Sequence, residues 1–127
     1  MNQPVRNFMT KTPHSANVDV DVSTALKIMN QNNIRHLPVL EGGVIVGILS
    51  DRDLELVGLT SAGSQLKVRD LMNFDPYIVE PDLDIQVVAM GMLERKISSA
   101  IVKGTEDEPW GIFTVTDALM ILAGLRK

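Results

Sequence analysis

The sequence predicts a mixed α/β fold built from two tandem β-α-β-β-α repeats related by pseudo-two-fold symmetry. Three observations lead to this expectation. The chain resembles itself at a nearly constant spacing, both copies show the same order of apolar runs and helical faces, and both carry the pattern Gly-Ile-x-[Ser/Thr]-x-x-Asp near their ends. With 127 residues, a single domain made of two halves is the expected organisation.

The internal repeat is clearest when the chain is aligned with itself. Residues 5–9 resemble 68–72, which lie 63 positions further along, and one added residue in the loop 104–109 raises the spacing to 64. We place repeat A at about 5–60, a small and polar linker at about 58–67 and repeat B at about 68–125. A half of about 60 residues would be marginally stable alone, so both halves should form one domain, 1–127. Identical pairs at these spacings are Pro13 and Pro76, Asp21 and Asp84, Met29 and Met92, Ile34 and Ile97, Val39 and Val102, and Gly47 and Gly111.

Each repeat is expected to begin with a short strand and a helix. Residues 15–20 and 77–83 are typical of strands, and Asp21 and Asp84 are suitable helix N-caps. The residues that follow repeat with helical periodicity, which predicts one buried face per helix. These apolar residues are Val22, Ala25, Leu26 and Met29 in repeat A, and Ile85, Val88, Ala89 and Met92 in repeat B.

Each repeat is expected to end with a hairpin and a second helix. Residues 35–50 form two apolar runs around Gly42 and Gly43, and residues 98–114 show the same pattern with a longer acidic loop. Ser50 and Thr114 follow these runs and are expected to start the last helix of each repeat.

Composition restricts the class of protein. The chain is 45% hydrophobic, has a net charge of −4 and contains no cysteine, which excludes disulfides and thiolate chemistry and favours a cytoplasmic location. Its start lacks the apolar stretch of a signal peptide, and its apolar runs are far shorter than the roughly 18 to 20 residues of a membrane span, so we expect no membrane partner. The acidic balance and the 4% aromatic content argue against nucleic acid as a partner.

The repeated motif at 47–53 and 111–117 has two compatible interpretations. In the first, the Ser or Thr and the Asp form a capping box at the start of a helix. In the second, the same helix N-terminus binds a ligand. The hydroxyl and the unpaired backbone N–H groups would contact a phosphate, and the Asp would accept hydrogen bonds from both hydroxyls of a ribose.

Both repeats resemble the CBS motif, which is named after cystathionine β-synthase. The resemblance is carried by residues 33–39 and 47–54, with weaker copies at 96–102 and 111–118, and it covers nearly the whole chain. It implies a stand-alone CBS pair, or Bateman module. Such a regulatory, non-enzymatic unit binds adenosine-containing nucleotides of the AMP, ADP and ATP class in clefts between its repeats and forms homodimers. It requires no cofactor, and Mg²⁺ would arrive with the nucleotide.

The resemblance also implies that each binding cleft combines residues of both repeats. The first cleft would gather Thr114, Thr116 and Asp117 with Thr10, Thr12, His14, Ile34 and Arg35. The second would gather Ser50, Arg52 and Asp53 with Asn73, Asp75, Tyr77, Ile97 and Ser98. Arg52 favours phosphate in the second cleft. Residues 100–102 of repeat B depart from the Leu-Pro-Val at 37–39, which favours the first cleft for adenine.

Metal and enzyme chemistry are not expected. His14 and His36 have no partners at metal-ligand spacing, and the acidic residues form no calcium loop. Ser50 and Thr114 have no base and orienting group in register for nucleophilic catalysis. The sequence also contains neither GxxxxGK[ST] nor GxGxxG.

Three functions remain open from the sequence. The first is a ligand sensor that signals through shape or dimer state to an effector protein, which is either another polypeptide or the remainder of a longer chain. The second is a ligand-free structural or interaction dimer. The third, nucleic-acid binding, is disfavoured by the charge. The apolar segment 120–125 would either pack the last helix on its own sheet or, in the first two functions, form a dimer face.

Overall fold

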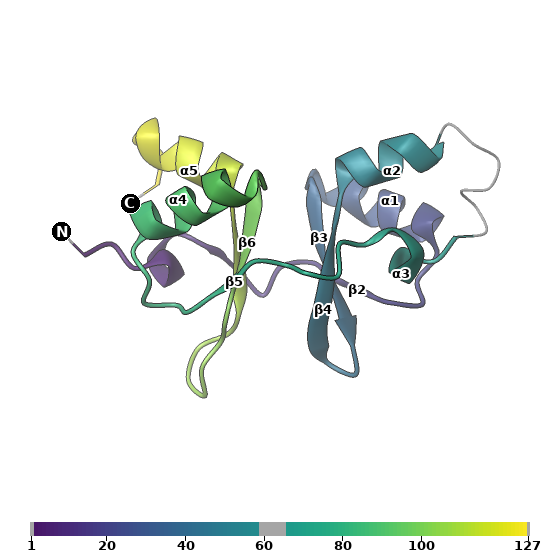
Figure 1. Ribbon diagram of the computed structural model, residues 1–127, viewed down its shortest axis with the longest axis horizontal. Helices are drawn as coiled ribbons and strands as arrows, with labels where there is room; N and C mark the ends of the chain where they lie inside the picture. The colour runs from purple at the N-terminus through teal and green to yellow at the C-terminus, as the bar shows by residue number, and fades with distance from the viewer. Residues whose placement is uncertain (1, 59–65, 127) are drawn as a thin grey trace. The chain divides into compact units, whose positions relative to one another are not determined.

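The structure, a computed structural model, describes residues 2–58 and 66–126, with the backbone alone for 56–58 (Figure 1). Most of the predicted linker, about 58–67, therefore lies outside the described residues. The chain forms two compact units: unit 1 comprises Met1–Pro13 and Tyr77–Lys127, and unit 2 comprises His14–Pro76. The N-terminal segment of repeat A thus belongs to unit 1 with most of repeat B, and the first segment of repeat B, residues 68–76, belongs to unit 2 with the rest of repeat A.

Unit 2 consists of a sheet, two helices that cover it and a short third helix. Its sheet has the order β2-β3-β4, in which β2 is parallel to β3 and β3 is antiparallel to β4. Helix α1 contacts β3 and α2, and α2 contacts β4, as Figure 1 shows. The elements are β2 (Ala16–Asn17), α1 (Val22–Asn32), β3 (His36–Glu41), β4 (Val44–Ser50), α2 (Asp51–Gly58) and α3 (Val68–Leu71).

Unit 1 repeats this order and adds a strand from the start of the chain. Its sheet has the order β1-β7-β6-β5, and β1 pairs antiparallel with β7. Both α4 and α5 pack on the core beside this sheet. The elements are η1 (Val5–Asn7), β1 (Thr10–Lys11), β5 (Ile78–Val79), α4 (Ile85–Arg95), β6 (Ser99–Val102), β7 (Gly111–Thr114) and α5 (Val115–Leu122).

The predicted β-α-β-β-α order is therefore confirmed in both repeats. Apolar periodicity explains it, because the predicted helical faces supply Met29 to the core of unit 2 and Val88 and Met92 to the core of unit 1. Leu26 is an exception. It was expected in the core, but it is 38% exposed, because Val22, Ala25 and Met29 fill the side of α1 that faces the sheet.

The two predicted N-caps also differ. Asp84 accepts a hydrogen bond from the backbone N–H of Gln86 at 2.8 Å, so it caps α4 as expected. Asp21 occupies the N-cap position of α1 but makes no capping bond with its side chain. Its carboxylate instead pairs with Lys67 Nζ at 2.8 Å, so the capping prediction was wrong for this residue.

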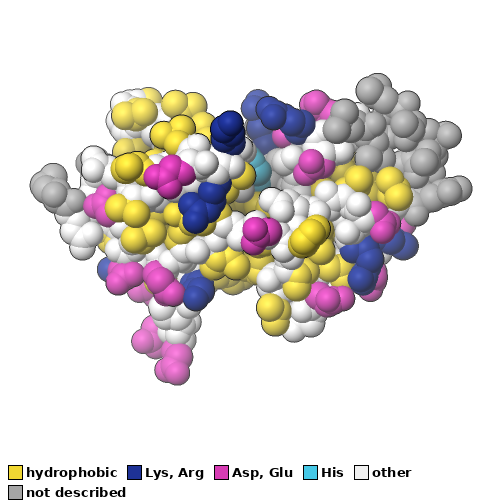
Figure 2. Space-filling view, in the orientation of Figure 1, with side chains coloured by type: hydrophobic (Ala, Val, Ile, Leu, Met, Phe, Trp, Pro, Cys, Tyr) yellow, Lys and Arg dark blue, Asp and Glu magenta, His cyan; other side chains and the backbone are white. Residues whose placement is uncertain are grey.

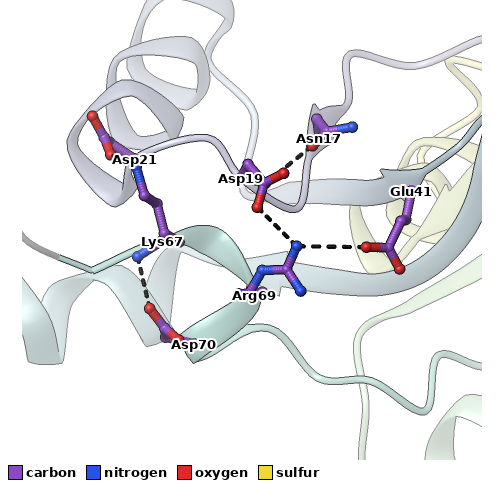
Figure 3. A network of polar contacts seen from close by, with 7 residues as sticks. All are labelled: Asn17, Asp19, Asp21, Glu41, Lys67, Arg69 and Asp70. Carbon is purple, nitrogen blue, oxygen red and sulfur yellow. Dashed lines mark hydrogen bonds and ion pairs between the residues drawn. The ribbon is translucent and has the colours of Figure 1, made fainter.

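Helix α3 is held to unit 2 by charged and backbone contacts (Figure 3). Arg69 Nη2 lies 2.7 Å from Asp19 Oδ1 and 3.5 Å from Glu41 Oε2. Such exposed ion pairs contribute roughly 0–1 kcal/mol each. The buried side chain of Val68, whose N–H donates to the carbonyl of Val20 at 2.8 Å, therefore provides the main anchor. These contacts of Val68 position the segment that continues from α3 to Asn73.

Candidate functional site

The two copies of the motif form the same hydrogen bonds at the starts of α2 and α5. In unit 2, Asp53 Oδ2 accepts from the Ser50 N–H at 3.1 Å and from the Ser50 hydroxyl at 2.9 Å. In unit 1, Asp117 Oδ2 accepts from the Thr114 N–H at 2.9 Å and from its hydroxyl at 3.2 Å. Both motifs are thus reciprocal capping boxes, in which one oxygen of the Asp carboxylate is already engaged.

The glycine that opens each motif permits close contact with a second backbone segment. Ile48, which follows Gly47, exchanges two hydrogen bonds of 2.9 Å with Asn73. A Cβ added at Gly47 would lie 2.8 Å from the Asn73 carbonyl oxygen, and one at Gly111 would lie 2.6 Å from that of Thr10. A larger residue would push these segments away from the motifs.

Alanine at either motif glycine should therefore destabilise the fold. We expect Gly47→Ala and Gly111→Ala to lower the free energy of unfolding by about 1–3 kcal/mol, because the neighbouring atoms include backbone that cannot move aside. Gly91→Ala is the control. Its Cβ would meet the far end of the Tyr77 side chain, and α4 would gain helix propensity, so we expect a change below about 1 kcal/mol. Urea unfolding of the three variants checks this; equal losses would contradict it.

The residues predicted for the first site are divided between the units. Thr10 and Thr12 belong to unit 1, as do Thr114, Thr116 and Asp117. Thr10 pairs with Ile112 in the sheet, and the Thr12 N–H donates to the carbonyl of Trp110 at 2.8 Å. His14, Ile34 and Arg35 belong to unit 2, where the carbonyl of Arg35 accepts from the Asp51 N–H at 2.9 Å.

The second predicted site is divided in the same way. Asn73 and Asp75 belong to unit 2 with Ser50, Arg52 and Asp53. The Asn73 side chain accepts from the Asp75 N–H at 3.0 Å. Tyr77, Ile97 and Ser98 belong to unit 1, where the carbonyl of Ser98 accepts from the Val115 N–H at 3.1 Å, at the start of α5.

The charges around the two motifs are unequal. Asp53 is partly exposed, and its second oxygen has no hydrogen-bond partner among the described residues. Asp117 is only 5% exposed, and its second oxygen pairs with Arg126 Nη1 at 2.7 Å. Arg126 was not predicted from the sequence, because it lies beyond the end of α5 and outside the motif.

Phe74 is a second candidate residue that was not predicted from the sequence. It is 82% exposed and follows Asn73, whose backbone pairs with Ile48 beside the Asp53 motif. An exposed aromatic ring is a suitable stacking surface for a nucleobase. Its position between two predicted site residues, Asn73 and Asp75, was the signal that could have identified it.

His36 lies opposite Ser50 in the β3–β4 pairing. Burial lowers the pKa of His36 from its usual value of 6.5, with a smaller contribution from Asp51 in the opposite direction. The folded state therefore favours the neutral imidazole. Its contribution to stability is present above pH 6.5 and is lost as the pH falls from there through the lowered pKa.

Replacing His36 with Gln should make the protein less sensitive to mild acid. Between about pH 7.5 and about pH 5, the free energy of unfolding should fall less in His36→Gln than in the unchanged chain, because the variant has no imidazole to protonate on unfolding. His14→Gln removes the other, exposed histidine and is the control. Urea unfolding at both pH values measures the difference; the same acid dependence in His36→Gln and the unchanged chain would contradict the assignment.

Neither a cluster of metal ligands nor a membrane-spanning helix is found among the described residues. No group of three or more His, Cys, Asp or Glu side chains in 2–58 and 66–126 is placed to hold a metal ion. In that same part of the chain, every helix is too short or too polar to cross a bilayer.

The fold and the doubled helix-start motif define a tandem module of two β-α-β-β-α repeats. The model of the CBS domain family matches residues 5–56 and 68–124. The chain belongs to the CBS domain family, which confirms the resemblance inferred from the sequence.

Curated relatives include much longer proteins. An inosine-5'-monophosphate dehydrogenase from Korarchaeum cryptofilum is 29% identical over 113 residues, which cover 89% of this chain. An L-aspartate semialdehyde sulfurtransferase from Methanocaldococcus jannaschii is 26% identical over 123 residues, or 96% of this chain. The matched regions span only 22% and 24% of those proteins, so the likeness concerns one module within each of them.

Solved structures share the fold at low sequence identity. The CBS domain pair of protein MJ0100, in complex with 5'-methylthioadenosine and S-adenosyl-L-methionine, has a TM-score of 0.86 and 24% identity, with 98% of both chains covered. The CBS domain of a bacterial CNNM/CorC family Mg²⁺ transporter in complex with ATP has a TM-score of 0.83 and 22% identity, covering 96% of this chain and 88% of that one. CBSX2 in complex with AMP has a TM-score of 0.80 and 24% identity, covering 96% and 97%. These structures confirm the fold class.

Proposed function

We propose that this chain is a regulatory module that binds an adenosine-containing ligand at its Ser/Thr-x-x-Asp motifs. The observation that carries the proposal is the partly exposed Asp53 carboxylate at the start of α2, with one oxygen engaged by Ser50 and the other without a partner among the described residues. Such an oxygen can accept hydrogen bonds from ribose hydroxyls, and charge-assisted bonds of this kind are strong. Arg52, one residue before Asp53, is exposed and suits a phosphate.

Two further observations support an adenosine-containing ligand. Phe74, whose ring is exposed, directly follows Asn73, and the backbone of Asn73 pairs with Ile48 of the Asp53 motif. Proteins of the same fold have been solved with S-adenosyl-L-methionine and 5'-methylthioadenosine, with ATP and with AMP. The proposal includes no catalytic step and no resident cofactor, and it keeps the cytoplasmic location that the cysteine-free sequence favours.

We also propose that the module acts as a homodimer through α4 and α5. These helices expose a set of large apolar side chains, and Figure 2 shows hydrophobic atoms gathered over α5. An apolar surface of this size favours burial against a protein partner. The exposed residues are Val87, Met90, Leu93, Leu119 and Leu122, followed by Leu125 after the helix, with exposed fractions between 50% and 83%.

In the dimer, unit 1 of a second copy fits this surface better than unit 2 of that copy does. The exposed side of α1, which corresponds to α4, is mostly polar: beside Leu26 it carries Ser23, Thr24, Lys27, Asn30 and Gln31. An apolar face gains most from burial against another apolar face.

The effector would be a further protein or the rest of a longer chain. It would respond to the change in shape or association that the ligand produces.

Thermal unfolding with a panel of ligands tests the proposed function. The panel comprises AMP, ADP, ATP, S-adenosylmethionine and 5'-methylthioadenosine at millimolar concentration, each with and without Mg²⁺. A ligand at 100 times its Kd stabilises the fold by about 2.7 kcal/mol and raises Tm by several degrees. A selective rise supports the proposal, and dependence on Mg²⁺ only with ATP or ADP would show that the metal arrives with the phosphates. No rise with any compound would overturn it.

A ligand-free interaction module is the second candidate, because the capping boxes alone account for the Ser, Thr and Asp residues of both motifs. In that case the panel would leave Tm unchanged, while the apolar surface of α4 and α5 would still bind a partner. The same experiment therefore separates the two functions.

A further inference from the structure

We propose that Arg126 closes the Asp117 motif to a ligand, so that the Asp53 motif is the principal binding site of the chain. This inference rests on the proposed function and specifies which of the two motifs performs it. It differs from the sequence-based expectation, in which the site of Asp117 was preferred for adenine. The argument depends on how the two carboxylates are occupied.

The Asp117 carboxylate has a hydrogen-bond partner on each oxygen. Oδ2 accepts from the N–H and hydroxyl of Thr114, and Oδ1 pairs with Arg126 Nη1 at 2.7 Å. A ribose that bound to Oδ1 would have to compete with this guanidinium. Because Asp117 is 5% exposed, removal of its counter-charge would leave a buried carboxylate whose only new partners were neutral hydroxyls, which is unfavourable.

Arg126 is itself held by more than Asp117. Its Nη1 also donates to the carbonyl of Phe8 at 2.8 Å, and its Nη2 lies 3.8 Å from Met120 Sδ. Phe8 is buried in the core of unit 1, and Met120 lies on α5. The guanidinium therefore bridges two elements of the unit, and its displacement would break contacts with both.

Among the described residues of unit 2, none pairs with Asp53 as Arg126 pairs with Asp117. Oδ1 of Asp53 has no partner among the described residues. The chain that follows α2 has the sequence Leu-Thr-Ser-Ala-Gly-Ser-Gln at 59–65, which contains no basic residue. The next cation, Lys67, pairs with Asp21. Residues 59–65 therefore contain no cation that could neutralise Asp53 in the way that Arg126 neutralises Asp117.

The residue before each motif Asp makes the same distinction. Arg52 precedes Asp53, whereas Thr116 precedes Asp117. Both are exposed. A ligand that carries a phosphate would therefore gain a charge-assisted contact in unit 2 that unit 1 does not offer from its motif. Both the open carboxylate and the nearby cation favour the Asp53 motif.

Calorimetric titration of the full chain tests the inference through its stoichiometry. AMP, ATP and S-adenosylmethionine are titrated separately into the unchanged protein, Arg126→Gln, and Arg126→Gln combined with Asp117→Asn. We expect one equivalent per chain for the unchanged protein, two for Arg126→Gln, and one again for the double variant. Arg6→Gln, which changes the net charge equally in the same unit, should stay at one equivalent.

A second readout uses the unchanged protein and does not depend on how well a variant folds. The NMR signals of the Arg126 guanidinium should keep their positions while the ligand saturates the first site. Movement of these signals in step with the first equivalent, or two equal equivalents in the unchanged protein, would overturn the inference. Binding of only one equivalent of ligand by Arg126→Gln would also overturn the inference. In each of these cases the chain still binds a ligand, so the proposed function would stand. Absence of binding in every variant would overturn both.

Discussion

Asp53→Asn should weaken binding of the adenosine-containing ligand by about 10- to 100-fold. The substitution keeps the size of the side chain and one oxygen that can accept from Ser50, so the cap of α2 is retained. It removes the negative charge that strengthens hydrogen bonds from the ribose hydroxyls, and such charged bonds are worth roughly 1.5–3 kcal/mol. Calorimetric titration with the ligand that raises Tm most gives the two Kd values.

Asp51→Asn is the matched control for this prediction. It removes the same charge two residues away, in the first turn of the same helix, but outside the Ser-x-x-Asp motif. We expect its Kd to stay within about threefold of the unchanged protein, since only long-range charge is altered. Equal weakening by both substitutions would point to general electrostatics. Unchanged affinity in Asp53→Asn would contradict a role for its carboxylate.

Leu119→Glu should convert the proposed homodimer into a monomer at micromolar concentration. Leu119 lies on α5 and is 58% exposed within the apolar surface of unit 1. A carboxylate buried at a dimer interface without a partner costs several kcal/mol, so we expect dissociation to increase by at least about 100-fold. Sedimentation equilibrium measures the change.

Val44→Glu provides the control for the dimer prediction. Val44 is 64% exposed and lies at the start of β4 in unit 2, away from α4 and α5 in the sequence. The same substitution there should leave association unchanged. The proposed interface would be wrong if the unchanged chain were monomeric at tens of micromolar, or if Val44→Glu dissociated the dimer as strongly as Leu119→Glu.

The order of the elements could be predicted because it depends on local periodicity. Val88 and Met92 fall on one side of α4, and the apolar runs around Gly42 and Gly43 form the expected hairpin of β3 and β4. The caps at Ser50 and Thr114 could be predicted for the same reason, since a capping box joins residues only three positions apart.

Contacts between distant parts of the chain could not be predicted in this way. Asp21 was expected to cap α1, but Lys67, 46 residues away, takes its carboxylate. The guanidinium of Arg126 reaches the carbonyl of Phe8 across 118 residues. No local pattern encodes these pairs, because they depend on which segments the fold brings together.

Contacts between distant residues in the candidate site could not be predicted from local patterns either. The pairing of Thr10 with Ile112 joins the start of the chain to the second hairpin, and only the family resemblance, not the periodicity of the residues, associated Thr10 with Thr114. The two motifs are nearly identical in sequence, so they did not predict that Asp117 has partners on both carboxylate oxygens while Asp53 has partners on one. This difference became apparent only from the ion pair between Asp117 and Arg126.

The most direct test of the central claim is to map ligand binding residue by residue. In a ¹H–¹⁵N NMR titration of the full chain with the ligand selected by thermal unfolding, we predict that the first amide signals to move are those of residues 47–54 and 73–75. The signals of 111–118 should move later or not at all. Signals that move first elsewhere, or no movement at saturating ligand, would contradict binding at the Asp53 motif.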